Sequence, residues 1–496
     1  MNKNNDTFCI KNGYKVNTRP QYSSYNDNNS YQPELYELAF YLAERSNAEY
    51  IIDIGGANWR QLKREEAKFK IIVVDFNLNL GFSQQQINIH HVIKHNLENG
   101  LPSIDRGVLE NSVVVVSDVI QYLQNPDPFL KDLSTLSKVC RYLLITTPDR
   151  DRTRGVGDFG PPLNKNHVRE WNIDEFNSLM SRYSVNKYMI GYTINTHIHE
   201  WKNTILVVSG TEAYAKPTNE VSVLAIINTY NEEDIIAETI NHLLLQGIDV
   251  KIIDNWSTDK TYEIVRELSE SSNRITVERY PDKPTEFYQW GKLLENVENL
   301  SSKLNYDWFI HYDADEIRES PWVEYNLRQA ISFVDYCGYN AIDFTVLDFR
   351  PINSAIVTNN HEDNLKFFEF GKRNGHFVQI KCWKKNGNVR VNLSESGGHE
   401  AFFSDRRVYP IKFLTKHYPL RNKEQALKKI FMDRNCRISP EEKSKGWHTQ
   451  YNSFTGSESF EWDKSYLIPW NRSFFISEYL VERISGIGIR RSGDII

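Results

Sequence analysis

The chain has 496 residues, which is too long for one ordinary domain and suits two or three compact ones. Its composition, 40% hydrophobic and 25% charged, is typical of a soluble globular protein. The formal net charge of -6 gives no global basic field, so neither nucleic acid nor anionic lipid is expected as a partner. The five cysteines lie far apart without a C-x-x-C pair, which disfavours a zinc knuckle or a disulfide framework and favours a reducing compartment.

The N-terminus is polar and lacks the apolar stretch of a signal peptide, and no apolar run is long enough to span a bilayer. We therefore expect a cytoplasmic protein, with the inner face of the membrane left open as its location. Residues 1–31 are rich in Asn, Tyr and Ser without apolar periodicity, which predicts a flexible tail or an irregular covering strand. An amphipathic helix is expected to begin at Pro33.

From this helix to about residue 210, short β-branched runs alternate with helical patterns. The expected strands are Tyr50 to Ile54, Ile71 to Val74, Ser112 to Val116, Tyr142 to Thr146 and Thr204 to Val208. Such alternation predicts βαβ units and a parallel, doubly wound α/β sheet covered on both faces. The polar stretch 211–220, with Gly and Pro, is typical of a linker.

The alternation restarts after the linker, so a second doubly wound α/β domain is expected over residues 221–440. Its strands are expected at Val221 to Ile227, Val250 to Ile253 and Trp308 to Tyr312. Residues 441–496 are irregular, with a plausible helix around 473–484, and are expected to pack on this second domain. The apolar segment from Phe474 to Ile484 carries acids and lacks a lysine-rich face, which favours packing over peripheral membrane contact.

The first expected strand runs into Gly55 and Gly56, small residues that allow a tight turn and a close approach of a ligand. The next strand ends at Asp75, roughly 20 residues after the glycines, where a carboxylate can accept the hydrogen bonds of a ribose diol. Dinucleotide enzymes share this arrangement, so these residues alone leave the cofactor open. The alternative is a plain structural turn of a doubly wound sheet.

Four segments follow in order: I-D-I-G-G-A-N, V-V-D-F-N, H-N-L-E-N-G-L-P and S-D-V-I-Q-Y-L-Q-N-P-D-P-F-L. With them, residues 32–210 resemble the class I S-adenosylmethionine-dependent methyltransferases, which implies a Rossmann-like fold and S-adenosylmethionine as cofactor. Asn96 stands where that family usually has an aspartate facing the adenine amine, and its carbonyl can still accept from an amine. Gln121-Tyr122 replaces the usual Glu-His. The resemblance places at the cofactor Asp53, Gly55, Gly56, Asp75, Asn96 and Asp118.

Similar proteins continue with segments like T-T-P-D-R-D-R-T-R-G and N-K-N-H-V-R-E-W-N, and both are present here. His167, Arg169 and Glu170 stand where related proteins approach the methyl acceptor, so they are the catalytic candidates of the first domain. Orientation supplies much of the acceleration of methyl transfer, and no general base is assigned. A surface loop held by an Arg–Glu pair is the alternative.

In the second domain, the apolar and aromatic run from Trp308 to Tyr312 predicts a central buried strand that ends in Asp313-Ala314-Asp315. In extended backbone, residues i and i+2 project to the same side, so Asp313 and Asp315 are expected to point together. Paired carboxylates suit Mn²⁺ or Mg²⁺, and a diphosphate would complete the coordination. The alternative is that both acids cap a helix beginning near Pro321.

Three segments in order, N-T-Y-N-E-E, I-I-D-N-W-S-T-D and H-Y-D-A-D-E, make residues 220–450 resemble glycosyltransferase family 2 and its GT-A fold. The resemblance implies a nucleotide-sugar donor, such as a UDP- or GDP-sugar. It implies that Asn228 and Tyr230 flank the nucleobase and that Asp254 binds uracil or the ribose. Asp313 and Asp315 would handle the diphosphate and the metal. Asn228 replaces the usual proline, and D-N-W-S replaces D-D-G-S, without loss of a carboxylate that the chemistry needs.

His399 and His417 are candidates for a third metal ligand or a phosphate partner, with a structural role as the alternative. Lys416, Arg421 and Arg434 would neutralise phosphate or an anionic acceptor, unless they are plain surface charges. An inverting transfer also needs a carboxylate that deprotonates the acceptor hydroxyl. The H-E-D-N-L segment looks like the family's E-D region, which ranks its aspartate first. The candidates for this base are Asp363, Glu362, Glu395 and Glu400.

The leading hypothesis is a bifunctional enzyme of bacterial surface-glycan biosynthesis. One domain would add a sugar to a glycan or lipid-linked saccharide, and the other would methylate a glycan or sugar. The alternative is a single glycosyltransferase whose first domain is a non-catalytic scaffold or binding module, as Asn96 and Gln121-Tyr122 suggest. An NAD-dependent oxidoreductase is disfavoured, because a bulky residue stands where the last glycine of G-x-G-x-x-G belongs.

Overall fold

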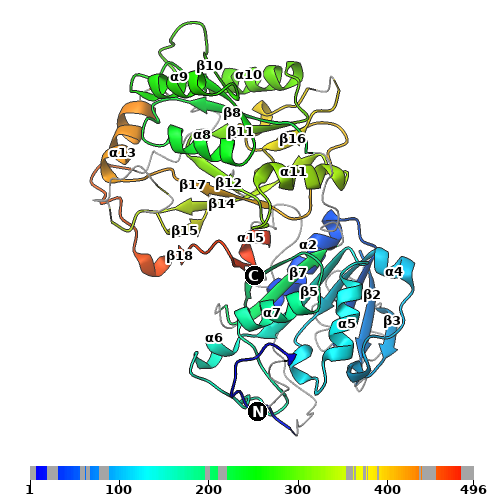
Figure 1. The fold of residues 1–496 in the computed structure, drawn as a ribbon. Coiled ribbons are helices and arrows are strands. Elements are labelled where there is room, and N and C mark those ends of the chain that lie inside the picture. Colours follow the sequence, from blue (N-terminus) through cyan, green and yellow to red (C-terminus); the bar gives the residue numbers. More distant parts are fainter. Residues whose placement is uncertain are drawn as a thin grey trace. The chain divides into compact units, whose positions relative to one another are not determined.

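The computed structural model describes residues 7–18, 32–55, 62, 68–76, 89–195, 202–210, 220–353, 361, 365–371, 376, 378–387, 390–434, 437 and 454–481. The chain forms two compact units, shown as ribbons in Figure 1. Unit 1 comprises Met1–Lys216 together with Arg472–Ile496, and unit 2 comprises Pro217–Asn471. The division falls inside the stretch 211–220 that the sequence predicts as a linker.

Unit 1 is built on one eight-stranded sheet with the order β19-β6-β7-β5-β4-β1-β2-β3. Its strands are β1 (Tyr50–Ile54), β2 (Lys70–Asp75), β3 (Ile89–Lys94), β4 (Ser112–Val116), β5 (Tyr142–Pro148), β6 (Tyr188–Thr193), β7 (Thr204–Gly210) and β19 (Phe475–Ile476). The first five strands run parallel, and β7 is antiparallel to both β5 and β6. The strand order reverses between β1 and β4, so the carboxyl ends of these two strands lie side by side.

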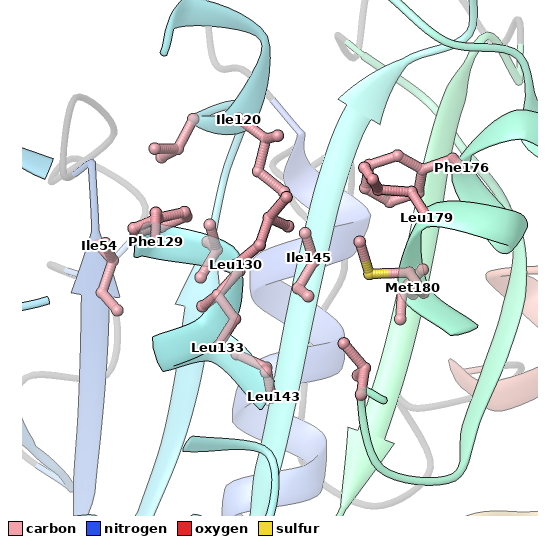
Figure 2. Close-up of a cluster of buried hydrophobic side chains, with 14 of the residues drawn as sticks. Ile54, Ile120, Phe129, Leu130, Leu133, Leu143, Ile145, Phe176, Leu179 and Met180 are labelled. Atoms are coloured by element: carbon pink, nitrogen blue, oxygen red, sulfur yellow. The ribbon is translucent and has the colours of Figure 1, made fainter. Parts of the chain in front are cut away.

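Helices cover both faces of this sheet. On one face, α5 (Asp127–Leu136) and α7 (Ile173–Arg182) direct apolar side chains such as Phe129 and Met180 at Ile54 and Ile145 (Figure 2). Helix α2 (Pro33–Arg45) packs against β4 and β5 and lies behind the strands in Figure 2. The shorter helices of unit 1 are η2 (Leu97–Asn99), α4 (Arg106–Glu110), η3 (Ile120–Tyr122), α6 (Arg150–Arg154) and α15 (Glu478–Val481). Burial from both sides explains why the central strands are continuous Val and Ile runs.

The helix predicted at Pro33 is confirmed in position but is wrong in character. Instead of presenting a polar face to solvent, α2 is buried along its length from Pro33 to Ala43. Its buried Glu34 accepts hydrogen bonds from Lys202 Nζ at 2.6 Å and from Thr193 Oγ1 at 2.9 Å. The pairing offsets the cost of burying this charge.

Residues 7–18 pack onto the core of unit 1. Phe8, Ile10 and Tyr14 are buried in the same hydrophobic cluster as α5 and α7, and the indole of Trp171 donates to the carbonyl of Phe8 at 2.9 Å. Of the two predictions for residues 1–31, the irregular covering segment therefore fits the described part.

The prediction that residues 441–496 pack on the second domain is wrong for the described residues 472–481, which belong to unit 1. Strand β19 pairs in parallel with β6 of unit 1, and the amide of Ser477 donates to the carbonyl of Tyr192 at 3.0 Å. An added Cβ at Gly191 would lie 1.8 Å from the carbonyl oxygen of Phe475, so the glycine permits this pairing. The segment covers backbone groups of β6 that would otherwise form the sheet edge. The described helix here is only α15, shorter than the one expected around 473–484.

Unit 2 contains a six-stranded sheet with the order β10-β9-β8-β11-β16-β13 and a five-stranded sheet with the order β12-β17-β14-β15-β18. The strands of the first are β8 (Val223–Thr229), β9 (Asp249–Asp254), β10 (Ile275–Arg279), β11 (Trp308–Asp313), β13 (Ala341–Ile342) and β16 (Cys382–Lys384). Those of the second are β12 (Glu316–Glu319), β14 (Phe344–Phe349), β15 (Phe367–Phe370), β17 (Phe413–His417) and β18 (Ile468–Pro469). Strands β10, β9, β8 and β11 are parallel, and the order reverses between β8 and β11.

The helices of unit 2 are α8 (Ile236–Leu245), α9 (Thr261–Ser271), α10 (Trp290–Lys303), α11 (Leu327–Tyr336), η6 (Ser394–Ser396), α13 (Lys423–Leu427), the π-helical η7 (Lys428–Arg434) and η9 (Lys464–Tyr466). The expected strands of this unit are confirmed as β8, β9 and β11. Among the described residues, none of the helices combines the length and the apolar character that crossing a membrane requires.

Candidate functional sites at two strand reversals

In an open α/β sheet, ligands bind outside the carboxyl ends of the strands, at the point where the strand order reverses. Each unit has one such point, at β1 and β4 in unit 1 and at β8 and β11 in unit 2. Most of the residues that the sequence nominates as ligand-binding lie at these two edges.

Gly55 begins the turn after β1. It has a φ of 86°, and a Cβ added there would lie 2.4 Å from Cγ2 of Val119, so both backbone and packing require glycine. Its amide donates to the carbonyl of Val74 at 2.8 Å, which places Asp75, at the end of β2, beside the same turn. Gly56 lies outside the described residues. The structure therefore brings together the turn and the carboxylate that the sequence nominates.

Asp53 lies inside the sheet rather than at its edge. The side chain is fully buried, and the hydroxyl of Tyr36 on α2 donates to it at 3.3 Å. Burial, with a further contribution from Asp75, raises the pKa of Asp53 to about 7. The Asp53 side chain therefore contacts α2 in the interior of unit 1 and does not point outward.

Asp118 follows β4 at the strand reversal, with a φ of 53°. Its amide donates to Thr146 Oγ1 at 3.1 Å, and the Thr146 hydroxyl in turn donates to Gln32 Oε1 at 2.7 Å. Burial raises the pKa of Asp118 to about 6, against the lowering effect of His167, Gln32, Gln121 and Thr146. Gln32 and Thr146 belong to this cluster and were not predicted, because no local sequence pattern links positions so far apart.

Asn96 has a role that the sequence did not predict. Its side chain is exposed, and its carbonyl accepts from the amide of Glu98 at 3.1 Å, which caps η2. The capping bond uses the same oxygen that the sequence assigns to an adenine amine. Asn96 therefore holds a loop whether or not it also touches a ligand.

The loop that carries His167, Arg169 and Glu170 is buried, so the alternative of a surface loop is wrong. His167 Nδ1 lies 2.5 Å from Glu170 Oε1, and the other Glu170 oxygen pairs with Arg154 at 2.7 Å. The ring of Tyr122 packs edge-on against His167, with centroids 4.8 Å apart. His167 is thus held near Asp118, consistent with its electrostatic effect on that acid.

Arg169 points into the protein. Its guanidinium donates to the carbonyls of Leu123 and Gln124, at 3.1 and 2.8 Å, and lies over the ring of Phe8. Burial lowers the pKa of Arg169 to about 10. Through these contacts Arg169 stabilises the loop after β4.

In unit 2, two buried polar side chains stand at the carboxyl end of β8. Asn228 is 7% exposed and Thr229 is 3% exposed. Neither the amide nitrogen and oxygen of Asn228 nor the hydroxyl of Thr229 has a hydrogen-bond partner among the described residues. Since unpaired buried polar groups are costly, they are typical of a site whose partner is a ligand.

Around these atoms lie Tyr230 and Asp254. The guanidinium of Arg437 lies 3.9 Å from the centre of the Tyr230 ring. Asp254, at the end of β9, is fully buried and accepts from the amide of Ser257 at 3.2 Å and from Arg279 Nε at 3.3 Å. Burial raises its pKa, opposed by these two partners. Since Thr229 pairs with Asp254 across the strands, the predicted nucleotide residues share one edge.

Asp313 ends β11 directly beside Asn228, its partner in the parallel register. Lys381 Nζ, missed by the sequence, donates to Asp313 Oδ2 at 2.6 Å. Burial alone would raise the pKa of Asp313, but Lys381 and His311 outweigh it and hold that pKa well below its usual range. The carboxylate is therefore charged and faces a cation of its own chain.

The structure bears on two expectations about Asp313 and Asp315. Residues 314–315 form a turn. Asp313 and Asp315 therefore do not share one extended segment, and strand geometry does not determine where their side chains point. The chain then continues as β12, and the next helix, α11, is capped by Asn326 rather than by these acids. The capping alternative is thereby excluded, and the two carboxylates contact different lysines.

Asp315 accepts a hydrogen bond from Lys429 Nζ at 2.7 Å, and the same ammonium lies 2.8 Å from Glu232. His417 Nε2 lies 3.7 Å from Asp315 Oδ2. Burial raises the pKa of Asp315, but Lys429, His417 and Arg421 together hold it below its usual value. Arg421 is itself buried between Glu232 and Asp234, so it is not a surface charge.

The remaining candidates of unit 2 have other partners. His399 Nδ1 lies 3.0 Å from Gln379 Nε2, and Glu400 accepts from Arg406 at 2.6 Å. Glu395 lies exposed in η6, and its amide donates to Asn392 Oδ1 at 3.0 Å. Lys416 pairs with Glu319 at 2.7 Å, and Arg434 lies 3.4 Å from Glu232. Glu362 and Asp363 lie outside the described residues.

Comparison with known proteins gives a family match within the second unit. Residues 224–330 match the model of glycosyl transferase family 2. This region begins at β8 and ends within α11, and so contains the edge with Asn228, Asp254, Asp313 and Asp315. Residues 224–330 are thus similar to this family, and the match covers less than half of the chain. No curated protein sequence matches the chain.

Solved structures give more remote likenesses. The methyltransferase domain of bacterial CtHen1 is 15% identical with a TM-score of 0.27, covering 36% of this chain and 98% of that one. A SAM-dependent methyltransferase from Archaeoglobus fulgidus is 15% identical with a TM-score of 0.25, covering 36% and 94%. The mannosyltransferase PcManGT from Pyrobaculum calidifontis, in complex with GDP-Man and Mn²⁺, is 21% identical with a TM-score of 0.21, covering 26% and 36%. The order and direction of the strands themselves make both units α/β folds, the first of them Rossmann-like.

Proposed function

We propose that unit 2 transfers a sugar from a nucleoside diphosphate donor to a glycan or lipid-linked saccharide. The observation that carries the proposal is the set of unpartnered buried atoms of Asn228 and Thr229, next to Asp254 and Asp313, within the region that matches the family. An amide offers both a donor and an acceptor to a nucleobase, and a buried carboxylate suits an N–H group or a ribose hydroxyl. These groups support a nucleotide site without choosing between UDP and GDP.

Two residues near the proposed nucleotide site fit a divalent cation. Asp315 Oδ2 and His417 Nε2 are 3.7 Å apart, and oxygen and imidazole nitrogen are ligands that Mn²⁺ accepts. Lys429 occupies the same oxygen but already touches Glu232 as a second partner. Bound there, Mn²⁺ or Mg²⁺ would stabilise negative charge on the leaving diphosphate. Lys381 and Lys429 add positive charge from the chain itself.

For the base that deprotonates the acceptor hydroxyl, we propose Asp363 first and Glu362 second. Glu400 is less suited, because Arg406 lies 2.6 Å from its carboxylate and competes for the charge. Replacing Asp363 by Asn should abolish transfer while leaving nucleotide binding within about twofold, since an amide keeps the shape but not the basicity. Transfer that persists in Asp363→Asn would reject this assignment.

The glycosyltransferase proposal is tested by transfer from radiolabelled UDP- and GDP-sugars, with Mn²⁺, Mg²⁺ or EDTA. We expect the sugar to be released from one of the two donors, and only when a divalent ion is present. We expect the double variant Asp313→Ala/Asp315→Ala to lose this activity. Full activity in that double variant would reject the metal site.

For unit 1 we propose that S-adenosylmethionine binds at the β1–β4 reversal and that the domain methylates a glycan or sugar. Support comes from the positive φ of Gly55, the neighbouring Asp75 and the half-buried Asp118 at one edge of a Rossmann-like sheet. Calorimetric titration with S-adenosylmethionine tests it, and Asp75→Asn should weaken binding by roughly tenfold, since a hydrogen bond to a charged group is lost.

A second candidate function for unit 1 is a scaffold or binding module. The capping bond of Asn96 favours it, because that oxygen already serves the η2 loop. Absence of heat or of a stability increase with millimolar S-adenosylmethionine would favour the scaffold.

We propose surface-glycan biosynthesis at the cytoplasmic face of a membrane as the setting, because sugar addition and methylation can act on one growing glycan. Modified glycan in cells that carry the gene, and its loss on deletion, would test this setting.

A further inference from the structure

Three residues next to the proposed cation site form a buried cluster that no prediction had included as a whole. His417, on β17, lies beside Asp348 on β14 and His376, and the nearest ligand atoms of the three lie within 4.8 Å of one another. Such a cluster either binds a cation itself or supports a neighbouring ligand. The individual distances decide between these two roles.

The distances favour a supporting role for Asp348. His417 Nδ1 lies 2.7 Å from Asp348 Oδ1, which is the length of a direct hydrogen bond. The other oxygen of Asp348 accepts from the guanidinium of Arg350 at 3.2 Å, and His376 Nδ1 lies 3.8 Å away. Both oxygens of Asp348 therefore already have partners within its own sheet region, His417 and Arg350.

The hydrogen bond has a consequence for the other ring nitrogen. If Nδ1 of His417 donates to Asp348, neutral imidazole carries its lone pair on Nε2. That nitrogen faces Asp315 Oδ2 at 3.7 Å. Carboxylates that hold a metal-binding histidine in this way fix both its tautomer and its ring orientation.

We propose that Asp348 is a positioning residue that fixes His417 with Nε2 toward Asp315, so that a divalent cation can bind between them. The inference rests on the proposed glycosyltransferase function and adds a residue that acts only through His417. Arg350 pairs with Asp348 at 3.2 Å and with Glu369 at 3.0 Å. Asp348, His417 and Glu369 lie on β14, β17 and β15, which are neighbouring strands of one sheet in unit 2.

The test is a titration of the full-length protein with MnCl₂, followed by electron paramagnetic resonance of free Mn²⁺. We expect Asp348→Asn to weaken Mn²⁺ binding by roughly 10- to 100-fold. In a His417→Gln background, Asp348→Asn should cause no further loss, because its effect passes through the imidazole. Glu369→Gln removes a charge from the other side of Arg350 and serves as the matched control, with Mn²⁺ affinity within about twofold of the unmodified protein.

Several outcomes separate the alternatives. If Asp348→Asn binds Mn²⁺ like the unmodified protein, the inference is rejected while the proposed function stands. If His376→Gln weakens binding as much as Asp348→Asn, the ion sits in the cluster itself and the positioning role is wrong. If the unmodified protein binds no Mn²⁺, the metal assignment fails together with this inference. Should Asp348→Asn fold poorly, the visible spectrum of Co²⁺ in Asp348→Glu, which retains the carboxylate, should still show nitrogen ligation, and its absence would contradict the inference.

Discussion

At the scale of single residues, the two sites are defined by polar groups that folding has buried at a cost. Asn228 and Thr229 lack partners, and Asp313 and Asp315 are charged beside lysines. In a protein stable by only a few kcal/mol, such groups are maintained where ligands or charge pairs compensate them. Substitutions at these positions can therefore distinguish the effect of these groups on ligand binding from their effect on the free energy of unfolding.

We expect Asn228 to contribute to nucleotide affinity but not to the stability of the free protein. Replacing it by Leu removes two unpaired buried atoms, so we expect the free protein to keep or gain stability, by up to about 1 kcal/mol. Nucleotide affinity should fall by roughly tenfold. The matched control is Asn186→Leu, because the side-chain amide of Asn186 donates to the carbonyl of Gly210 at 2.7 Å. Loss of this hydrogen bond should destabilise the protein. Melting temperatures with and without nucleotide measure the stability of the free protein and the effect of binding. A large loss of stability in Asn228→Leu would contradict the expectation that Asn228 does not stabilise the free protein.

Lys429 should compete with a divalent cation for Asp315. Lys429→Met leaves Asp315 and Glu232 without their shared ammonium, and breaking a buried pair costs about 3 kcal/mol. We expect the melting temperature to drop by roughly 5–10 °C in the absence of metal. Mn²⁺ should restore part of this loss and should bind more tightly than in the unmodified protein. If Mn²⁺ raises the melting temperature less in Lys429→Met than in the unmodified protein, the two cations do not share the site.

Asp53 should make unit 1 less stable as the pH rises. Its pKa is about 7 in the folded chain against an ordinary value of 3.8, so the folded state binds the extra proton between these values. The stability contribution is complete below about pH 4 and is lost as the pH rises through about 7. Asp53→Asn keeps an acceptor for Tyr36 and removes the titration, so it should melt higher than the unmodified protein at pH 8. Melting temperatures from pH 5 to 8 measure this, and parallel curves for the two proteins would reject it.

At the scale of elements, the buried parallel strands were the most predictable features. Continuous runs such as Ser112–Val116 match β4 residue for residue, because a strand buried on both faces needs apolar side chains throughout. Strand β3, with the sequence I-H-H-V-I-K, lies near the edge and carries exposed histidines, so its pattern gave no comparable signal. The turn at residues 314–315 and strand β12 were missed because local sequence does not fix the direction of the chain after a strand.

The added strand β19 gives a prediction at this scale. Gly191→Ala places a methyl group against the carbonyl of Phe475, so β19 should detach from β6. Hydrogen exchange at the amide of Ser477, which donates to Tyr192, should then become at least about tenfold faster. Gly157→Ala is the matched control, because nothing lies within 4 Å of an added Cβ there. Unchanged exchange in Gly191→Ala would contradict the pairing.

At the scale of the whole molecule, the sequence correctly indicated two α/β folds but misassigned the end of the chain. The candidate sites were predictable where a residue directly follows a buried strand, as Asp75, Asp254 and Asp313 do. Lys381, Lys429 and Asp348 were not predictable, because each reaches the site from an element distant in sequence. Such partners depend on sheet pairing and tertiary packing, which local patterns do not encode.

The function proposed for unit 2 requires that it hold a nucleotide with the help of a divalent cation at the β8–β11 edge. Isothermal titration of the full-length protein with UDP and with GDP, in MnCl₂ and then in EDTA, tests it most directly. We predict that one nucleotide binds with Mn²⁺ and that EDTA, Asp254→Asn and Asp313→Asn each weaken binding by roughly tenfold or more, while binding of S-adenosylmethionine stays unchanged. Failure of both nucleotides to bind, or equal binding by the unmodified protein and both variants, would contradict the account.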